Sequence, residues 1–432
     1  MLAFLGLLTI ILLLALVMAK KASPLVALIA VPIFTGLLAG FSSELLTFIT
    51  DGLKAISTTA VMFIFAILFF GVLMDAGTFE PIISWLLNIA GNDPTRITVV
   101  TAILAMIVHL DGSGAVTFLV TIPALLPLYN ALGMRRTTLA TIVALAAGTM
   151  NMLPWGGPTI RAATALNVPV TALFNPMLIP VLFGLLTVLM FAYVLGRKER
   201  RLILLAAGGV HLEREESLNQ KINPAARPKL LWFNLLLVIL SIITLISAVA
   251  PPHIIFMVAF AIAITVNYPN VNDQRERVDA HAKAALLMAS ILLAAGCFTG
   301  ILKGSGMIDA MAAAAVSFIP AAMGNHLAFI VGVFSMPASL LFDPDSFYFG
   351  VLPLLGKTAS HFNIAAIEVG RAAIIGQMTT GFPISPLTGS TFLLIGLTGV
   401  DLGEHQRKTI PLAFLVSMVM LIISLLIGVI NL

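Results

Sequence analysis

Apolar residues dominate this chain in runs long enough to form membrane-spanning helices. A helix needs roughly 20 apolar residues to cross the hydrocarbon core of a bilayer. Such runs occur at Leu2 to Ala19, Pro24 to Gly40, Ser57 to Met74, Thr137 to Leu166, Ala172 to Leu195, Leu231 to Val249, Pro252 to Tyr268, Ala284 to Leu302, His361 to Leu397 and Ile410 to Ile430. They recur along the whole chain, so we expect an all-α polytopic membrane protein rather than a barrel.

Two further apolar stretches, Thr95 to Tyr129 and Asn325 to Leu355, are interrupted near their middle by acidic and turn-forming residues. The interruptions read HLDGSGA, from His109 to Ala115, and LFDPDSFYFG, from Leu341 to Gly350. The segment before the first interruption makes about 22 Å of helix, which reaches mid-membrane but does not cross together with a returning arm. We therefore predict that each stretch is a re-entrant helical hairpin with the polar sequence at its tip.

Composition supports a membrane protein. The 432 residues are 60% hydrophobic and 10% charged, whereas a soluble domain carries about 25% charged residues. Lys20 and Lys21 follow the first run instead of preceding it, so we expect a retained helix rather than a signal peptide. Cys297 is the single cysteine, which excludes an intramolecular disulfide. The basic pI near 9.3 is explained by loops at an anionic leaflet, so we expect no nucleic-acid partner.

The basic residues predict the orientation in the membrane. If both hairpins leave on the side they entered, most of the 23 lysines and arginines, including those of the Arg197 to Lys229 loop, share one face. By the positive-inside rule this face is cytoplasmic, so both termini lie on the outer side of the membrane. The membrane expected is the inner (plasma) membrane of the cell. If the hairpins were simple crossings, the Arg197 to Lys229 loop would face outward, against the rule.

The two halves of the chain resemble each other. FFGVLMDAG (Phe69 to Gly77) corresponds to CFTGILKGSG (Cys297 to Gly306), and GTMNMLPWGGP (Gly148 to Pro158) corresponds to GQMTTGFPISP (Gly376 to Pro386), at offsets of 229 and 228. With the predicted topology the copies are inverted. Inverted repeats place a substrate site near the midplane, beside interrupted helices, as in secondary transporters.

The predicted organisation follows from this repeat. The first repeat spans 1–196, with scaffold helices in 1–91, a hairpin and a broken helix in 94–168 and a helix at 172–195. A cytoplasmic linker spans 197–230. The second repeat spans 231–432, with scaffold helices in 231–303, a hairpin and a broken helix in 325–398 and a helix at 410–430. The amphipathic stretches EPIISWLLNIAGN and GMIDAMAAAAVSF lie at matching points and are interfacial arms or surface helices.

The hairpin tips carry the acidic candidates. Asp111 lies between Leu110 and Gly112, and Asp343 and Asp345 flank Pro344. An intramembrane carboxylate costs about 2.5–3.5 kcal/mol on insertion scales and indicates function by default. Each carboxylate could instead cap a returning helix, and the two roles are compatible.

The broken helices supply the neutral candidates. Pro154, Gly156, Gly157 and Pro158 interrupt one span, and Gly381, Pro383 and Pro386 interrupt its counterpart, which exposes amides and carbonyls at half-helix ends. Ordinary interhelical hydrogen bonding is the alternative role for the donors nearby. These donors are Asn151, Thr159, Thr379, Ser385, Thr388 and Ser390, with Ser113 and Ser346 at the tips.

Two arginines and one histidine complete the candidates. The guanidinium groups of Arg161 and Arg371, inside broken spans, suit carboxylate recognition; either could instead extend toward the interface or pair with Glu368. His109 is a possible proton carrier by its intrinsic pKa, or a hydrogen-bonded structural residue.

The segments MNMLPWGGPTIRAATAL, LDGSGAVTFLV, DSFYFGVLPLL and GEHQR resemble the citrate-metal:proton symporter family (CitMHS) of the ion transporter superfamily over nearly the whole chain. The resemblance implies a homodimer that imports citrate complexed with a divalent cation, driven by protons, by an elevator mechanism. It implies no permanently bound cofactor, the cation (Mg²⁺ or Ca²⁺) being part of the transported complex.

Family roles carried onto matching positions place substrate, metal or proton binding at Asp111, Gly112, Asn151, Gly156, Gly157, Thr159, Arg161 and Asp345. We expect Asp111 and Asp345 to be the metal ligands, and Asp111, Asp343 and Asp345 to couple protons or metal. The complete set of residues that we expect to contact the substrate is Gly112, Ser113, Asn151, Gly156, Gly157, Thr159, Arg161, Ser346, Thr379, Ser385, Thr388 and Ser390.

Other classes fit less well. An intramembrane enzyme would need a catalytic constellation such as HExxH, which the sequence lacks, so we expect no enzyme. GVLPLLGKT departs from P-loop spacing and follows a hairpin. A permease for gluconate or a dicarboxylate is the nearest alternative function, and an ion channel the next; accumulation of substrate against its gradient separates a transporter from a channel.

Overall fold

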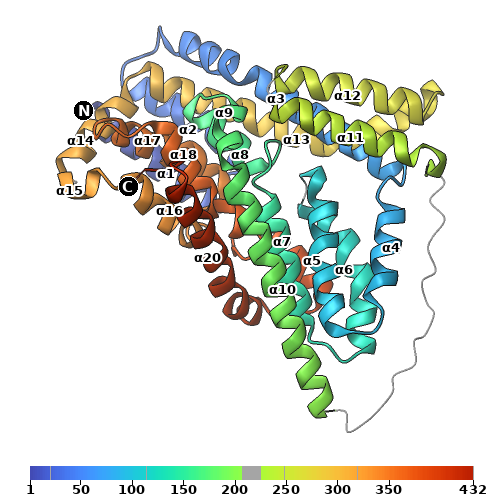
Figure 1. The fold of residues 1–432 in the computed structure, drawn as a ribbon. Helices are drawn as coiled ribbons and strands as arrows, with labels where there is room; N and C mark the ends of the chain where they lie inside the picture. The colour runs from blue at the N-terminus through green and yellow to red at the C-terminus, as the bar shows by residue number, and fades with distance from the viewer. Residues whose placement is uncertain (20, 113, 207–224, 248, 319, 432) are drawn as a thin grey trace.

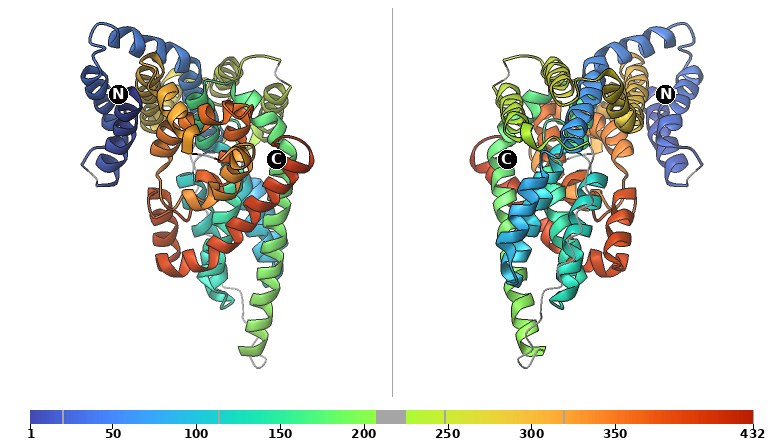
Figure 2. Two further views of the ribbon diagram at one scale, coloured as in Figure 1. Left: turned by 90° about the vertical axis from the view of Figure 1, so that its left-hand side faces the viewer. Right: turned by 90° about the vertical axis from the view of Figure 1, so that its right-hand side faces the viewer.

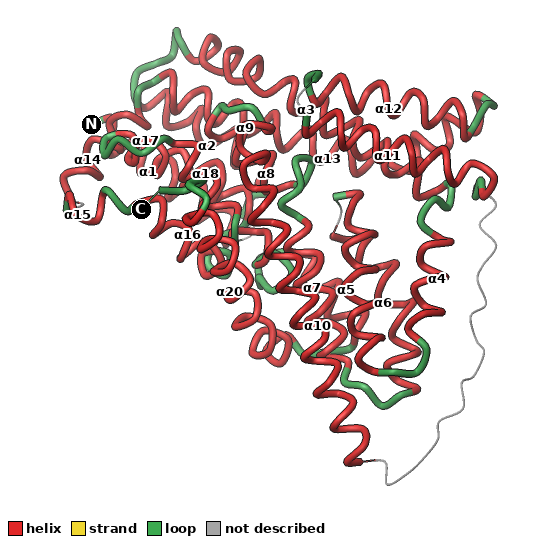
Figure 3. The backbone as a smooth tube through the Cα atoms, in the orientation of Figure 1, coloured by secondary structure: helices red, strands yellow, loops and turns green. Residues whose placement is uncertain are grey.

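The computed structural model describes residues 1–432 except 20, 113, 207–224, 248, 319 and 432 (Figure 1). Within the described ranges the chain forms helices joined by short loops and contains no strand (Figure 3). The expected all-α fold is therefore confirmed.

The first half of the chain runs to residue 206. Its helices are α1 (Leu2–Met18), α2 (Pro24–Leu38), α3 (Leu45–Asp75), α4 (Glu80–Ala90), α5 (Pro94–Val108), η1 (His109–Asp111), α6 (Gly114–Ala131), α7 (Arg136–Met150), α8 (Gly157–Leu166), α9 (Val170–Phe174), η2 (Asn175–Met177) and α10 (Leu178–Ala206).

The second half begins after the undescribed residues 207–224. Its helices are η3 (Pro228–Leu230), α11 (Leu231–Ile246), α12 (Pro252–Asn267), α13 (Val271–Gly304), α14 (Met307–Phe318), α15 (Ala321–Gly324), α16 (Leu327–Ala338), η4 (Ser346–Val351), α17 (Leu352–Ser360), α18 (Ala366–Ile374), η5 (Gly376–Thr380), α19 (Gly389–Thr398) and α20 (Leu402–Leu426).

Seven helices of the described chain are long and apolar enough to cross a membrane, so the protein is a multi-pass membrane protein. These segments are Leu45–Asp75, Pro94–Asp111, Gly114–Ala131, Val170–Leu205, Pro228–Ile246, Val271–Gly304 and Leu402–Leu426. The amphipathic stretches of the sequence form helices as well, α4 and α14.

Two helices begin before the apolar spans predicted from the sequence. Helix α3 begins at Leu45 rather than Ser57, and α13 begins at Val271 rather than Ala284. The additional turns carry charged side chains such as Asp51 and Lys54, which are exposed. Charge on an exposed face ends an apolar run in the sequence but does not interrupt backbone hydrogen bonding, so the helices continue beyond the apolar segments.

The helices form two groups. Helices α3, α11, α12 and α13 lie along the top of the molecule in Figure 1, and α5, α6, α7 and α10 lie below them. Helices α3 and α13 cross with their backbones in contact: a Cβ placed on Gly52 would lie 2.0 Å from the carbonyl oxygen of Gly296 and 2.9 Å from the Cα of Gly300. Only residues without a side chain permit this crossing.

Contacts in one half recur in the other. Helix α2 packs against α13 as α12 packs against α3, and α5 packs against α7 as α16 packs against α18. At residue level, Gly52 contacts Gly300, and Gly71 contacts His281. Residues 229 positions apart correspond in the two halves, so Gly52 corresponds to His281 and Gly71 corresponds to Gly300. The contact of Gly52 with Gly300 therefore corresponds to the contact of His281 with Gly71. A two-fold axis relating the halves would produce such reciprocity.

Both interrupted stretches form hairpins. Helices α5 and α6 are antiparallel arms joined through Gly112, whose φ of 74° is left-handed; the Thr101 Oγ1 and Tyr129 OH atoms, one on each arm, lie 3.0 Å apart. In the second hairpin, α16 leads to a turn and returns as η4 and α17. Its base is closed where Gly324 meets the ring of Phe362.

The chain termini lie apart from the end of α10. Both termini are at the left of Figure 1, while the last turn of α10 is at the bottom. The views of Figure 2 agree, with the end of α10 at the lower extreme of the molecule.

Candidate functional site

The first broken helix lies at the centre of the molecule. Helix α7 ends at Met150, and α8 starts at Gly157 without a side-chain cap. Pro158 has no amide hydrogen, so the uncapped amides of the first turn belong to Gly157 and Thr159. The connecting turn is tight: a Cβ on Gly156 would lie 2.1 Å from the Asn151 carbonyl oxygen. Thr159 Oγ1 donates to the Met152 carbonyl at 2.8 Å and closes the turn. The glycine at 156 is thus required by the backbone.

The first hairpin tip packs onto this break. Trp155 Nε1 donates to the Leu110 carbonyl at 2.7 Å, and a Cβ on Gly112 would lie 3.3 Å from Trp155. The Trp155 ring stacks on Phe70 of α3, with ring centroids 5.4 Å apart. Trp155 therefore fixes the tip beside the break, and Asp111 of that tip is partly buried there.

Asn151 links three elements. Its Nδ2 donates to the Met378 carbonyl in the second break at 2.9 Å, and its Oδ1 lies 3.5 Å from His109 Nε2 of the first hairpin. His109 is fully buried, and its Nδ1 lies 2.8 Å from Thr117 Oγ1. The amide of Asn151 thereby joins the first hairpin and both breaks.

The second break is a strained turn. Between α18 and α19 the backbone passes through Gln377, with ψ 112°, and Met378, with φ 53° and ψ 18°. A non-glycine residue in the left-handed region costs of order 1–3 kcal/mol and is concentrated at functional sites. Tyr348 of the second hairpin donates its hydroxyl hydrogen to the Gln377 carbonyl, so the hairpin holds this turn. Thr379 Oγ1 is used locally, on the Ile375 carbonyl at 2.9 Å.

A buried ion pair joins the second hairpin tip to the first break. Arg161 Nε of α8 donates to Asp345 Oδ1 at 2.7 Å, and the two residues are 8% and 6% exposed. Asp343 has a different geometry: its Oδ1 accepts from the backbone amides of Asp345 and Ser346, both at 3.1 Å, and its Oδ2 accepts from the Ser346 hydroxyl. Asp343 thus caps the turn that directs Asp345 toward Arg161.

These contacts define a central cluster, made of His109, Asn151, Arg161, Asp345 and the Gln377–Met378 turn. It joins two hairpin tips and two helix breaks, through bonds between residues as far apart in sequence as 184 and 227 positions. A guanidinium, a carboxylate, backbone carbonyls and uncapped amides meet in one buried place. Such a set can bind an anionic carboxylate and a hard cation together.

Gln377 is a candidate that the sequence analysis missed. Its side chain is fully buried, and neither its nitrogen nor its oxygen has a hydrogen-bond partner among the described residues; Thr380 Oγ1 is similar. Buried polar groups are nearly always paired, so an exception requires an explanation. The only signal in the sequence is an amide inside an apolar broken span, in GQMTTG.

The remaining predicted residues are placed less centrally. Ser385 Oγ donates to the Ser339 carbonyl, and Thr388 Oγ1 donates to the Phe382 carbonyl at 2.6 Å, so both hydroxyls stabilise the turn before α19. Ser390 is on the first turn of α19, near Gly114 of the first hairpin. Arg371 donates to the carbonyls of Val429 and Ala172, away from the cluster. Ser113 lies outside the described residues.

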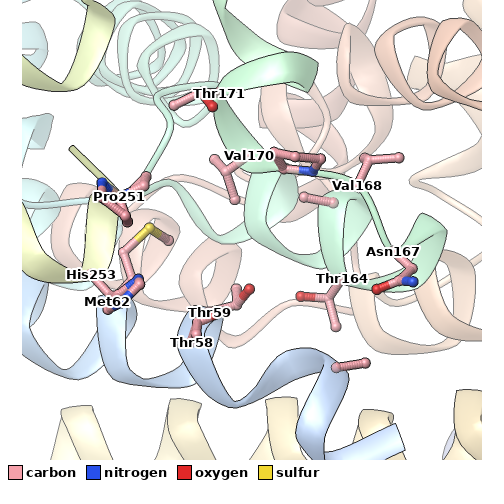
Figure 4. A pocket seen from close by; sticks show the side chains of 14 residues that line it. Thr58, Thr59, Met62, Thr164, Asn167, Val168, Val170, Thr171, Pro251 and His253 are labelled. Atoms are coloured by element: carbon pink, nitrogen blue, oxygen red, sulfur yellow. The ribbon is translucent and has the colours of Figure 1, made fainter. Parts of the chain in front are cut away.

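Two cavities adjoin the far end of α8. One has a volume of about 330 Å³ and is lined by α3, the end of α8 and the start of α12 (Figure 4). The other has a volume of about 420 Å³ between α3, α8 and α13. Both include Thr164 and Asn167, and Thr164 lies one helical turn beyond Arg161. Neither cavity is lined by a residue of the central cluster.

No group of three or more histidine, cysteine, aspartate or glutamate residues that could hold a metal occurs among the residues with described positions. The side chains therefore offer no preformed multidentate metal cage there. Asp345 and the backbone carbonyls could supply only part of a coordination sphere. A cation bound here would need oxygen ligands from another molecule or from water.

Comparison with known proteins identifies the family. The citrate transporter family model (CitMHS) matches residues 5–376. A citrate transporter of Bacillus subtilis is 44% identical over the whole of both chains. A Mg(2+)/citrate complex secondary transporter of the same organism is 42% identical over 100% of this chain and 99% of its own. The crystal structure of the Alcanivorax borkumensis YdaH transporter is similar in fold, with a TM-score of 0.61 at 12% identity, over 99% of this chain and 98% of that chain.

Proposed function

Because the chain belongs to the citrate transporter family, whose relatives are transporters and not enzymes, we propose that it is a secondary transporter that imports citrate as a complex with a divalent cation, coupled to protons. The proposal is supported by two relatives, 44% and 42% identical, that carry citrate and Mg(2+)/citrate in their names. The observation in this chain that carries it furthest is the buried pair of Arg161 and Asp345 at the meeting point of both tips and both breaks.

The complex and the site have complementary chemistry. Citrate with three ionised carboxylates and one divalent cation has a net charge of −1, with carboxylates to be recognised and a hard cation to be coordinated. Arginine recognises a carboxylate with two parallel hydrogen bonds, and the uncapped start of α8 favours an anion. Citrate itself supplies several of the cation's oxygen ligands, which fits a site whose described residues include no group of three or more histidine, cysteine, aspartate or glutamate residues that could hold a metal.

We place the binding step at the ion pair. In the structure Arg161 Nε donates to Asp345 Oδ1. An incoming citrate carboxylate replaces Asp345 on the guanidinium, and the released Asp345 carboxylate ligates the cation or accepts the coupling proton. Asp343 stays bonded to the amides of Asp345 and Ser346, so the tip retains its shape during the exchange. Asp111 is the second proposed acid, on the opposite tip.

The proposed mechanism is of the elevator type. The reciprocal contacts of Gly52 with Gly300 and of Gly71 with His281 support two inverted repeats with α3 and α13 in a rigid scaffold. The first hairpin (α5, α6) and α7 belong to the lower group. The second break and α19 pack against α7 and α6, and α18 packs against α8, so we propose that both hairpins and both breaks move as one body. Helices α4 and α14, which contact α5 and α17, are the proposed arms between the groups. We further propose a homodimer in the plasma membrane, with the 197–230 linker cytoplasmic.

The test is uptake of labelled citrate into proteoliposomes with Mg²⁺, with Ca²⁺ or with a strong chelator, each with and without an inward proton gradient. We expect uptake that requires a divalent cation, saturates, and accumulates citrate when the gradient is present. Equal uptake with the chelator would refute transport of a complex. Uptake of gluconate or a dicarboxylate in preference to citrate would assign the protein to another carboxylate, and flux without accumulation would indicate a channel.

A further inference from the structure

A large groove lies outside the site described above, between α4, α5 and α10. Its volume is about 1550 Å³, larger than the roughly 300–1,000 Å³ of small-ligand pockets. Its apolar lining includes Trp85 and Ile89 of α4, Val99 and Ile103 of α5, and Val194 of α10. Trp85 is 61% exposed and Val194 is 54% exposed, so the groove opens to the surroundings of the helices.

One band of this groove is strongly basic. Arg96 lies in the first turns of α5, and Arg197, Lys198, Arg200 and Arg201 follow along α10. Asp93 is the single acidic residue in the lining, and it lies 3.9 Å from Arg200. Among the described residues, Arg96, Lys198 and Arg201 have no ion-pair partner.

The nearby glutamate does not neutralise the band. Glu199 is 1% exposed and is bonded to Arg135 Nε at 2.8 Å and to the hydroxyl of Thr138. Because it points into the helix bundle, its charge is compensated by residues that do not line the groove. The basic band therefore faces outward with an excess of positive charge.

The order of residues in the groove matches a molecule with an anionic head and long apolar chains. Helix α5 runs from Arg96 at the base of the hairpin through Val99 to Ile103, toward the tip, and Val194 precedes Arg197 on α10. Apolar lining thus extends from the basic band along α5 toward the hairpin tip, and Leu202, Leu204 and Leu205 of α10 add apolar lining on the other side of the band. Basic pockets between transmembrane helices bind anionic lipid headgroups.

We propose that this groove binds an anionic diacyl phospholipid, with the phosphate on Arg96, Lys198 and Arg201 and the acyl chains along α4, α5 and α10. The charge of the band selects an anionic headgroup over a zwitterionic one. The apolar wall selects a lipid over free phosphate or citrate. The groove shares no residue with the central cluster.

The test uses Trp85 as a reporter in the full-length protein. Trp232 is 80% exposed and would respond to any lipid, whereas Trp155 is 3% exposed, so a Trp232→Phe chain leaves Trp85 as the accessible indole. This protein is reconstituted with brominated phosphatidylglycerol or brominated phosphatidylcholine, and quenching of fluorescence is measured against lipid fraction. We expect half-maximal quenching at a phosphatidylglycerol fraction about tenfold lower than for phosphatidylcholine.

Two charge-neutralising variants separate the groove from general surface attraction. Arg96→Gln with Arg201→Gln should remove most of the preference, while Arg275→Gln with Lys283→Gln on α13 makes the same change in net charge and should retain it. An unchanged preference in the first variant, or equal loss in both, would overturn the proposal.

Other occupants would give different results. If residues of the 207–224 segment filled the groove, the triple variant Glu213→Gln, Glu215→Gln and Glu216→Gln would increase quenching by phosphatidylglycerol; the proposed lipid site predicts no increase. If a second copy of the chain covered the groove, neither lipid would quench Trp85. Either result would overturn the proposal.

Discussion

Arg161 and Asp345 form an ion pair in which each side chain is only 9% exposed. Removing one member of a buried ion pair costs about 3–5 kcal/mol, because the other charge is left unpaired. We therefore predict that Arg161→Met lowers the thermal unfolding midpoint by several degrees and abolishes citrate uptake. Adding Asp345→Asn should restore much of the midpoint but no uptake. Thermal unfolding in detergent and uptake in proteoliposomes measure the two effects, and normal uptake by Arg161→Met would remove Arg161 from the site.

The two acidic tip residues provide a second test at this scale. Asp111→Asn and Asp345→Asn keep the size of the side chain and part of its capping ability, but remove the charge and the titrating proton. We predict folded protein in which uptake is lost or no longer responds to the proton gradient. Asp51→Asn makes the same change at an exposed carboxylate of α3; it is the matched control and should retain the response. Full coupling in both Asn variants would leave these acids as helix caps.

Gln377 gives a prediction of the opposite sign for stability. Its amide group is buried without a partner among the described residues, which costs about 1–3 kcal/mol. Gln377→Met replaces it with an apolar side chain of similar length, so we expect a higher unfolding midpoint together with weaker citrate uptake. A lower midpoint would show that the amide already has hydrogen-bond partners in the folded protein, and unchanged uptake would exclude a role in binding.

At the residue scale, sequence reasoning could identify charged groups inside apolar segments, because burying a charge there has a high free-energy cost. Asp345 and Arg161 are charged residues in apolar surroundings, and that cost marked them. Which partner each would choose was not predictable, since the pair joins residues 184 positions apart. Gln377 was missed because a single neutral amide has no spacing or charge that distinguishes it from interhelical hydrogen bonding.

At the scale of elements, the crossing of α3 and α13 depends on glycine. A Cβ on Gly300 would lie 2.3 Å from the carbonyl oxygen of Phe48, and backbone at that distance must move. We predict that Gly300→Ala lowers the unfolding midpoint and the yield of folded protein. Gly396→Ala is the control, because no atom lies within 4 Å of a Cβ at that position; it should raise the midpoint slightly, since alanine favours a helix over glycine by about 1 kcal/mol. Equal behaviour of the two variants would contradict the close crossing.

The breaks and hairpins were predictable from glycine and proline in the sequence, because these residues limit helices locally. The starts of α3 and α13 were not, because their first turns expose charged side chains that resemble loop residues. The left-handed turn at Met378 was also unexpected. It is held by Asn151 and Tyr348, two side chains from other elements, so tertiary contacts override the local preference.

At the scale of the whole molecule, the basic residues predict how the protein is oriented in the membrane. Arg96 and the basic residues of α10 line one groove, and Lys408 bonds Thr138 nearby, as expected if they share the predicted cytoplasmic face. In a Cys297→Ala background, we predict that Ser217→Cys is labelled by an impermeant thiol reagent only after the cells are opened, and that Asn431→Cys is labelled in intact cells. The reverse pattern would invert the topology.

The long separation between Arg161 and Asp345 has a consequence during synthesis of the protein. A ribosome that adds roughly 5–20 residues per second needs on the order of 10–40 s to make the 184 positions between them. During this interval α8 is already made, but its guanidinium lacks the carboxylate that later neutralises it. A nascent chain that stops before residue 345 keeps a cationic half-helix in a hydrophobic environment. Chains truncated before residue 345 should therefore be recognised as incomplete and degraded. In the finished chain the carboxylate of Asp345 neutralises the guanidinium, so the finished chain should not be degraded in this way.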